Sequence, residues 1–384
     1  MRILLIVSLL FLVSPLFPGQ ANMDIITLGA DKVEDELYVP YDMKIGPDEN
    51  FYVFDNKDHS LKVYSSLTGK FLRRIGGKGQ APGEYLGFGG FDFSNDKKLF
   101  FIEGHHGHPW ITFMELSGKY NRIIKISKKS GYGFNNTKAL PDGRIIAEMY
   151  RYIWFEKKAG LCVDSIYSNL VLIDQNGNTS QPFIEKKIPF SVSETPSQSN
   201  SLIPFIPKFL WDMTSDNQIV FTLGNTNILE IYNLSGKLIR KIKTPLPEAP
   251  KITSRDLDEW KKKEKANLIK KFGNEGFSRK FPAIKRYNES FHERKPIISK
   301  ISVTPSGNVL ICEKKPEEIK ENKYYLIDFN GKLLTRIETQ AYKITISKNF
   351  ILYVIDDEEE NPSVYCMKRI GSEKDDLLRL NNIK

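Results

Sequence analysis

Short apolar segments alternate with polar turns along most of this chain of 384 residues. Residues 52–70 and 101–119 align without a gap, and each contains an apolar strand, a polar loop, a second strand and a turn that ends in Gly-Lys. Residues 220–237 repeat the pattern with one residue fewer, and residues 170–178 and 325–332 repeat its second half. This self-similarity predicts an architecture built from one repeated unit.

Two kinds of tight turn divide each unit. The first joins a first strand to a second and contains proline with further turn-forming residues, as in residues 46–50, 141–144 and 305–308. The second joins a third strand to a fourth and contains one glycine, at Gly69, Gly118, Gly177, Gly236 and Gly331. Such turns between apolar strands indicate β-hairpins. Four antiparallel strands per unit are typical of a β-propeller blade.

The predicted fold is therefore all-β, a six-bladed β-propeller. The blades are expected to begin near Tyr41, Phe91, Thr137, Trp211, Ile298 and Tyr342. The sixth blade lacks a clear last strand, because residues 367–370 run into a charged tail. A closed ring leaves no open sheet edge, so we expect the spare strand at residues 24–28 to complete this blade. A five-bladed or open array is the alternative.

Three segments resemble a known family. They are residues 37–40, residues 51–55 with His59 ahead of the next strand, and residues 68–85, with the sequence TGKFLRRIGGKGQAPGEY. They are similar to the NHL-repeat-like six-bladed propellers that bacteria export. The resemblance is strongest in the first two blades and implies architecture more than function, because that family is defined by its fold.

The first 21 residues predict export. Met1-Arg2 provides a positive start, residues 3–17 are almost entirely apolar, and small residues precede a cleavage point after Ala21. This pattern is typical of a signal peptide. An N-terminal membrane anchor is the alternative, but it needs about twenty apolar residues. We expect a periplasmic or secreted monomer without a membrane span, with the propeller formed by residues 22–384.

The cysteine content does not support a disulfide framework. The chain has only Cys162, Cys312 and Cys366, an odd number without the spacing of a metal site. One bridge is compatible with the sequence, and Cys312 with Cys366 is the favoured pair.

The long connections are all expected on one face of the propeller. Loops between second and third strands, and connections between blades, lie opposite the short turns. This class contains residues 151–168, 183–209, 244–296 and 313–322. Long loops in compact domains are often functional. We therefore expect the long-loop face to carry the function.

The insert at residues 244–296, between blades four and five, is basic and partly helical by prediction. A helix should follow the capping pair Thr253-Ser254 and end near Gly273. Its partial apolar stripe comprises Leu257, Trp260, Leu268, Ile269 and Phe272. Residues 251–300 contain fifteen Lys and Arg against seven Asp and Glu, which is nearly all of the net charge of +9.

Two interpretations of the insert remain open. It is either a solvated helix docked by its stripe, or a lid that attracts an anionic ligand. Four lysines are the candidate ligand contacts in the second interpretation: Lys261, Lys262, Lys263 and Lys265. Nucleic acid is not expected as a partner, because the basic stretch lacks aromatic platforms.

A histidine cluster provides a candidate metal site. Residues 103–110 contain His105, His106 and His108, and the repeat alignment places His108 at the blade position of His59. Three imidazoles with one open position are what catalytic zinc, or another divalent metal, requires. Alternatively these histidines cap strand ends, because Asn227 occupies the same position in the fourth blade.

Three functions are compatible with this sequence. The leading hypothesis is an exported binding module that recognises an anionic ligand or a protein partner with its long-loop face, using Trp110 and the four lysines. The second is a metal-dependent lyase or hydrolase at the propeller mouth, around His59 and the histidine cluster. The third is a subunit of a surface assembly, which would carry a large apolar patch on the propeller rim.

Overall fold

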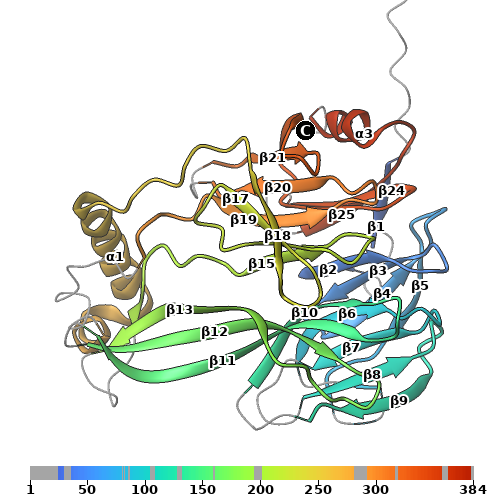
Figure 1. The fold of residues 1–384 in the computed structure, drawn as a ribbon, viewed down its shortest axis with the longest axis horizontal. Coiled ribbons are helices and arrows are strands. Elements are labelled where there is room, and N and C mark those ends of the chain that lie inside the picture. The colour runs from blue at the N-terminus through green and yellow to red at the C-terminus, as the bar shows by residue number, and fades with distance from the viewer. Residues whose placement is uncertain are drawn as a thin grey trace, which may run out of the picture.

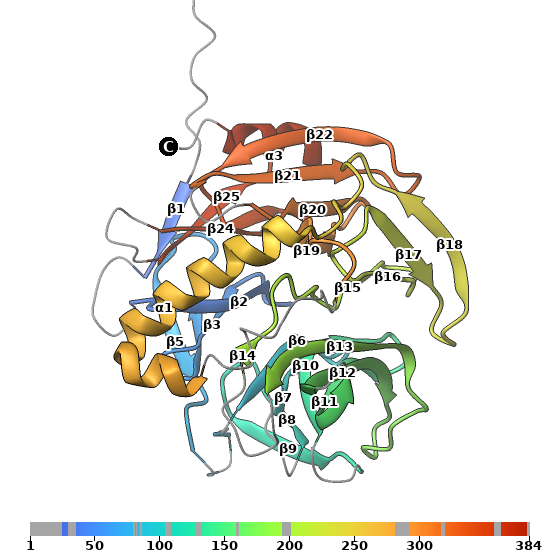
Figure 2. The ribbon, with the colours of Figure 1, turned by 90° about the vertical axis from the view of Figure 1, so that its left-hand side faces the viewer.

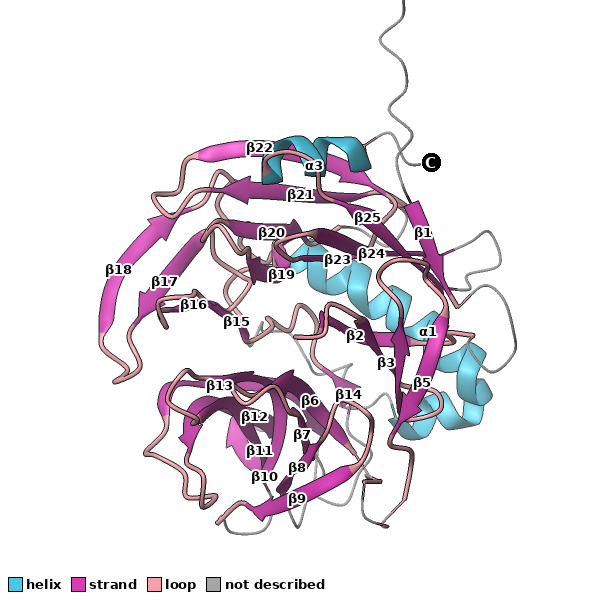
Figure 3. Cartoon of the chain, turned by 90° about the vertical axis from the view of Figure 1, so that its right-hand side faces the viewer, coloured by secondary structure: helices cyan, strands magenta, loops and turns pink. Residues whose placement is uncertain are grey.

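The computed structural model describes twelve stretches of the chain: residues 25–29, 36–79, 81, 83–84, 87–103, 109–127, 132–158, 161–193, 201–280, 292–315, 319–356 and 362–381. Their strands form six antiparallel sheets. Viewed from the side, the strands run across the molecule (Figure 1), and a quarter turn shows the sheets arranged around a common centre (Figures 2 and 3).

Each sheet is one blade, with its first strand nearest the centre. Blade one contains β2 (Pro40–Ile45), β3 (Phe51–Asp55), β4 (Ser60–Tyr64) and β5 (Phe71–Ile75). Blade two contains β6 (Phe88–Phe93), β7 (Leu99–Glu103), β8 (Trp110–Met114) and β9 (Tyr120–Lys125). Blade three contains β10 (Tyr132–Ala139), β11 (Ile145–Lys158), β12 (Leu161–Ile173), β13 (Phe183–Ser193) and the short β14 (Ser201–Leu202).

The other three blades follow the same order. Blade four contains β15 (Leu210–Met213), β16 (Ile219–Thr222), β17 (Ile228–Tyr232) and β18 (Leu238–Lys243). Blade five contains β19 (Ile298–Val303), β20 (Val309–Glu313), β21 (Asn322–Ile327) and β22 (Leu333–Thr339). Blade six contains β23 (Lys343–Ile346), β24 (Phe350–Asp356), β25 (Pro362–Lys368) and β1 (Ile25–Leu28). The predicted six-bladed, all-β fold is confirmed, and each predicted blade start lies in or next to a first strand.

The N-terminal strand closes the ring. β1 pairs antiparallel with β25, with Ile26 opposite Cys366 and Leu28 opposite Val364. Leu28 is buried in a core that combines Met43 of blade one with Val364 of blade six. The last blade therefore takes its outer strand from the start of the chain, as the unpaired edge of the sheet required.

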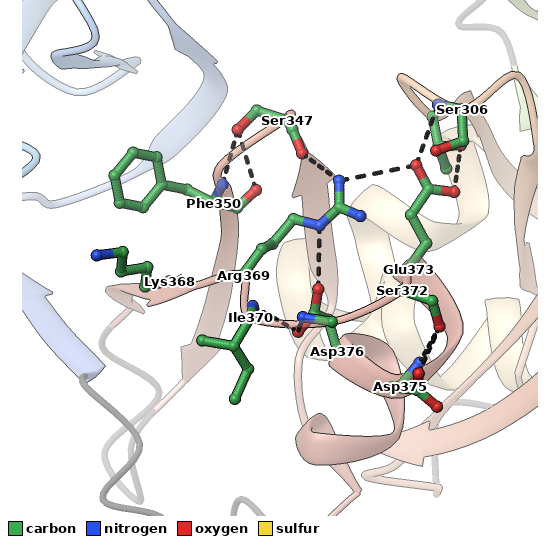
Figure 4. Close-up of polar contacts among 12 residues, drawn as sticks. Ser306, Ser347, Phe350, Lys368, Arg369, Ile370, Ser372, Glu373, Asp375 and Asp376 are labelled. Carbon is green, nitrogen blue, oxygen red and sulfur yellow. Dashed lines mark hydrogen bonds and ion pairs between the residues drawn. The ribbon is translucent and has the colours of Figure 1, made fainter.

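The C-terminal segment is a helix rather than a charged tail. α3 (Glu373–Leu380) begins after Ser372, whose hydroxyl accepts a hydrogen bond from the Asp375 amide at 3.2 Å. Glu373 is buried and accepts from Thr304 Oγ1 at 2.6 Å and from the Ser306 amide at 3.1 Å (Figure 4). The helix therefore fastens blade six to the short turn between β19 and β20 of blade five.

A second network holds α3 to its own blade. Asp376 is fully buried and accepts hydrogen bonds from Arg369 Nε and from the Ile370 amide, both at 3.1 Å (Figure 4). A buried carboxylate needs such partners, because removing its hydration is costly. The sequence does contain the signal of this helix, although it was interpreted above as a charged tail. The signal is a capping serine followed by acidic residues and by Leu377 and Leu380, both buried.

The prediction of loops in blade three is wrong. Residues 151–158 and 161–168 extend β11 and β12, and residues 183–193 form β13. The three strands make a long arm that reaches away from the ring (Figure 1). Register shifts interrupt the pairing between Ile153 and Glu156 and between Asp164 and Ser165. Each shift breaks the alternation of apolar and polar residues from which a strand is recognised.

The favoured disulfide pair is also wrong. Cys162, Cys312 and Cys366 are free thiols, and all three are buried. Cys312 belongs to the core between blades five and six, whereas Cys366 belongs to the core between blades six and one. Burial raises the pKa of the Cys366 thiol to about 12. Within the described residues, no helix has the length and apolarity that a membrane crossing needs.

Closure by β1 makes a direct prediction for stability. A chain that begins at Gly29 should lose at least about 3 kcal/mol of unfolding free energy relative to one that begins at Asn22, because it loses the β1–β25 ladder and the buried Leu28. Urea unfolding of both chains measures the difference. The exposed Thr27→Ala variant is the control and should change stability by less than about 0.5 kcal/mol. Equal midpoints for the two chains would contradict closure by β1.

Candidate functional site

Ion pairs between blades connect the innermost strands near the short turns. Lys44 Nζ of β2 lies 3.2 Å from Asp92 Oδ1 of β6, and Lys138 Nζ of β10 lies 2.9 Å from Asp212 Oδ1 of β15. Asp92 also accepts from the Ala139 amide at 2.9 Å. All four charged residues occupy the same position, two residues before the turn into the second strand. These charges are therefore paired around the centre of the ring, and each pair joins two neighbouring blades.

Blades five and six depart from this arrangement. At the same position they carry Ser302 and Thr345, whereas Lys300 and Lys343 stand two residues earlier in their strands. Residues two apart in a strand share a face and are separated by about 6.6 Å. The two lysines therefore lie one layer nearer the long-loop face, at the mouth of the central channel. Asp42 of blade one occupies that layer too.

A cavity of about 660 Å³ opens at this mouth. First strands contribute Tyr41, Asp42, Phe88, Asn135, Asn136, Lys300 and Lys343 to its wall. The third-blade arm contributes Glu148, Tyr150, Tyr152, Ile166, Ser168 and Ile188, and the segment before blade four contributes Ile206, Pro207, Lys208 and Phe209. The wall therefore combines aromatic rings with cationic side chains.

The two lysines are the least compensated charges of this wall. Burial lowers the pKa of Lys343 to about 7 against the attraction of Asp42, and burial also lowers the pKa of Lys300. Lys343 donates a hydrogen bond to the Tyr41 carbonyl. Among the described residues, neither lysine takes part in an ion pair within 4 Å. An anion that entered the cavity would supply the missing negative charge.

Glu148 gives the opposite wall an unusual carboxyl group. It lies on β11 opposite Asn135 and is 8 % exposed. Burial raises its pKa to about 7, although the nearby polar side chains of Asn135, Trp211 and Ser168 favour its charged form. Below neutral pH this carboxyl group is therefore largely protonated and can donate a hydrogen bond, whereas at pH 7 about half of it is ionised. The site thus combines a proton donor with the half-buried cations Lys300 and Lys343 and the exposed Lys208.

A second cavity, of about 390 Å³, lies between blades two and three on the short-turn face. Its carboxylates are engaged within their own turns: Asp142 binds the Arg144 side chain, and Asp174 accepts from Asn178. Turn geometry accounts for these residues. We therefore take the channel mouth as the candidate site.

The structure places the predicted ligand contacts outside the mouth cavity. Trp110, the first residue of β8, lines a separate hollow of about 150 Å³ with Glu84 and Tyr120 of blade two. Lys261, Lys262, Lys263 and Lys265 lie on α1 (Ser254–Lys280), where all but the half-buried Lys261 are exposed. None of the five lines the mouth cavity.

Helix α1 docks by its first turns. Leu257 is buried against Val163 of the arm and Ile203, with Trp260 packed beside them. Asp256 and Thr253 cap the helix reciprocally, with Asp256 Oδ2 accepting from the Thr253 amide at 2.9 Å. Helical dihedral angles break at Gly273 (φ 69°, ψ 177°), where the sequence predicts the helix to end. α1 lies beside the tips of β11, β12 and β13 and crosses in front of the ring (Figures 1 and 2).

The histidine hypothesis rests largely on residues outside the described stretches. His105, His106 and His108 lie there, so their position relative to His59 is not part of the structure. His59 has a positive φ of 52° between β3 and β4, and its Nδ1 is buried without a hydrogen bond. In the described part of the chain, no three His, Cys, Asp or Glu side chains form a group able to hold a metal ion. A metal centre that includes His59 stays a hypothesis.

Sequence reasoning missed the residues of the mouth cavity. The signal was present in the first strands, where Lys300 and Lys343 stand among apolar residues at one position of neighbouring blades. Comparing the six first strands at equal distance from their turns separates these lysines from Lys44 and Lys138. Glu148, Tyr150 and Tyr152 lay in a segment that the sequence assigned partly to a loop.

The raised pKa of Glu148 predicts a pH-dependent stability. Its pKa in the folded protein, about 7, exceeds the ordinary value of 4.5, so the unfolded chain loses this proton first as pH rises. The carboxyl group should therefore destabilise the fold by about 3 kcal/mol as pH rises from 4.5 to 7. Glu148→Gln should lack this change. The difference in unfolding free energy between wild type and variant at pH 4.5 and 7.5 measures it, and a constant difference would contradict the assigned pKa.

Comparisons with known proteins bear on the fold. A protein from Bacteroides fragilis described as exported matches with a TM-score of 0.50 and 13 % identity, over 91 % of this chain and 96 % of that one. Virginiamycin B lyase from Staphylococcus aureus matches with a TM-score of 0.46 and 10 % identity, over 91 % and 99 %. The PQQ-bound aldose sugar dehydrogenase from Streptomyces coelicolor matches with a TM-score of 0.43 and 10 % identity, over 90 % and 98 %.

At 13 % identity, the likeness to the Bacteroides fragilis protein concerns the fold alone. None of the curated proteins matches the sequence. The family described as TolB-like 6-blade propeller-like matches residues 21–349, and the chain belongs to that family.

Proposed function

We propose that this protein is an exported binding module that holds an anionic ligand at the mouth of its propeller channel. The observation that carries the proposal is the pair Lys300 and Lys343, which lack ion-pair partners among the described residues and line an aromatic cavity of about 660 Å³. Export rests on the predicted signal peptide, which would place the mature chain in the periplasm or outside the cell.

The electrostatics of the cavity favour one negative charge rather than many. Lys300 and Lys343 lie in the same layer as Asp42, and Glu148, whose pKa is about 7, is about half protonated at pH 7. Burial has already lowered the pKa of both lysines, so a bound anion would raise the pKa of each and restore its charge. Tyr41, Phe88 and Tyr150 offer apolar surface for the body of the ligand. The ligand should therefore combine a single anionic group with a ring system.

The exposed lysines of α1 have a weaker role in this proposal. They lie on a solvent-facing helix, where charges separated by more than about 8 Å are largely screened at physiological salt. They would accelerate the encounter with an anion and contribute little to the bound state.

A matched pair of probes tests the proposal. 2-Naphthoate carries a carboxylate, whereas 2-naphthamide has the same rings and no charge. The protein should bind 2-naphthoate at pH 6.5. Either Lys343→Met or Lys300→Met should weaken this binding at least about tenfold, because a charge-assisted hydrogen bond is lost. Binding of the amide should change little. Fluorescence titration gives both affinities.

The same fluorescence titration is repeated over a range of pH and with a control variant. Affinity for the acid should fall as pH rises from 6 to 8.5, since Lys343 loses its proton near pH 7, and Lys343→Met should flatten this dependence. Lys262→Met on α1 should leave the affinity within about twofold at 0.15 M salt. Equal binding of acid and amide, or an affinity unaffected by both channel lysines, would refute the proposal.

A further inference from the structure

Strand β11 carries a row of aromatic side chains that leads out of the mouth cavity. Successive side chains of a strand alternate between faces, so Glu148, Tyr150 and Tyr152 share one face, and Trp154, at the register shift of β11, stacks on Tyr152. Glu148, Tyr150 and Tyr152 line the cavity, and Trp154 continues the row along the arm. The row therefore begins in the candidate site and runs outward.

Ring contacts fix the row as a continuous surface. The Tyr152 and Trp154 rings are stacked, with centroids 5.1 Å apart and planes inclined by 21°. Tyr150 meets Tyr152 edge-on at 5.9 Å. Phe190 of β13 packs against both Tyr152 and Trp154, at 5.5 and 6.5 Å. Trp154 is nevertheless 55 % exposed, so a broad ring held by its neighbours faces solvent.

The charges along the arm indicate what such a row can bind. Lys187 forms an ion pair with Glu156, and Arg151 lies over the rings of Tyr132 and Tyr167. These cations are engaged, so the arm does not suit a polyanion such as nucleic acid. The cavity wall also offers polar groups from Asn135, Asn136 and Ser168 beside the rings. A long acyl chain has no group that could hydrogen-bond with them.

Sugars match this combination of flat rings and polar groups. A pyranose ring has a C–H face that packs flat on an aromatic ring, and hydroxyls around its edge that hydrogen-bond to amides and hydroxyls. Same-face residues of a strand recur every 6.6 Å or so, a spacing at which several rings of one oligosaccharide can contact one row. The inner end of the row lies in the channel mouth, whose wall also contains Lys300 and Lys343.

We propose that the protein binds an acidic oligosaccharide, with its carboxylate at Lys300 and Lys343 and its following sugar rings on Tyr152 and Trp154. This inference rests on the proposed function, since it names the ligand class of the same site. It extends that site outward along the arm to Trp154, which does not line the mouth cavity.

Three saccharides separate the contributions of charge and length. Glucuronate has the charge without the chain, xylotriose has the chain without the charge, and glucuronosyl-xylobiose has both. Glucuronosyl-xylobiose should bind at least about tenfold more tightly than either. Trp154→Ala should remove most of its advantage over glucuronate and leave the affinities for glucuronate and 2-naphthoate unchanged. Isothermal titration calorimetry on the mature chain gives all of these affinities.

Two variants act as controls. Trp154→Phe keeps a ring and should retain part of the advantage, whereas Tyr120→Ala removes an aromatic that is also exposed, at 38 %, on β9 of blade two and should have no effect. The midpoint of thermal unfolding should fall by no more than about 2 °C in Trp154→Ala, because the ring is 55 % exposed, although the variant loses its contacts with Tyr152 and Phe190. Equal loss for glucuronate and the trisaccharide in that variant would overturn the role of the row.

The remaining outcomes distinguish the two proposals. If 2-naphthoate binds through the channel lysines but glucuronosyl-xylobiose binds no better than glucuronate, the oligosaccharide inference fails and the anion site stands. If dodecanoate binds in a Trp154-dependent manner and the saccharides do not, the row binds acyl chains and the inference is wrong. If 2-naphthoate does not bind, the proposed function itself fails.

Discussion

Pairing of the last sheet edge with the first residues of the chain is the constraint on which this structure depends. Once β1 pairs with β25, the six blades form a ring and their first strands converge at its centre. Side chains on those strands then approach one another across blade boundaries. Charges at that position must be paired or neutralised, because little water remains to solvate them. The pairs Lys44 with Asp92 and Lys138 with Asp212 meet that requirement in four of the blades.

The mouth of the channel differs because blades five and six carry their lysine two residues earlier in the first strand than blades one to four carry their paired charge. Lys300 and Lys343 lie where the channel opens, and Asp42 is the carboxylate of that layer. The net charge of the sequence gives a misleading picture here, since most of it belongs to residues 251–300, and nine of the fifteen Lys and Arg residues of that segment lie on α1. Two half-buried lysines matter more to a bound ligand than the three exposed lysines Lys262, Lys263 and Lys265 of α1, because salt and water screen the exposed charges.

The sequence predicts the parts of this fold that local patterns determine. Blade starts, tight turns and the closing role of residues 25–28 follow from alternation, turn residues and the need to pair a sheet edge. The arm was missed because register shifts near Ile153 and Asp164 interrupt alternation. The site was missed for a different reason. Whether an inward lysine is paired depends on the neighbouring blade, as the contrast between Lys138 and Lys343 shows, and that neighbour is distant in sequence.

The pKa of Lys343 tests most directly whether burial disfavours the charge of a lysine at the channel mouth. A ¹⁵N NMR titration of the lysine side chains, with the Lys343 signal assigned by its loss in Lys343→Met, measures the pKa of this one ammonium group. We predict a titration midpoint of about 7 for this ammonium group, because burial disfavours its charge. The midpoint should rise when 2-naphthoate is bound, because a nearby anion favours the charged form. A midpoint near the ordinary lysine value of 10.5, unchanged by the anion, would contradict this prediction. It would show that the charge of Lys343 is already compensated and that the anion does not bind beside it.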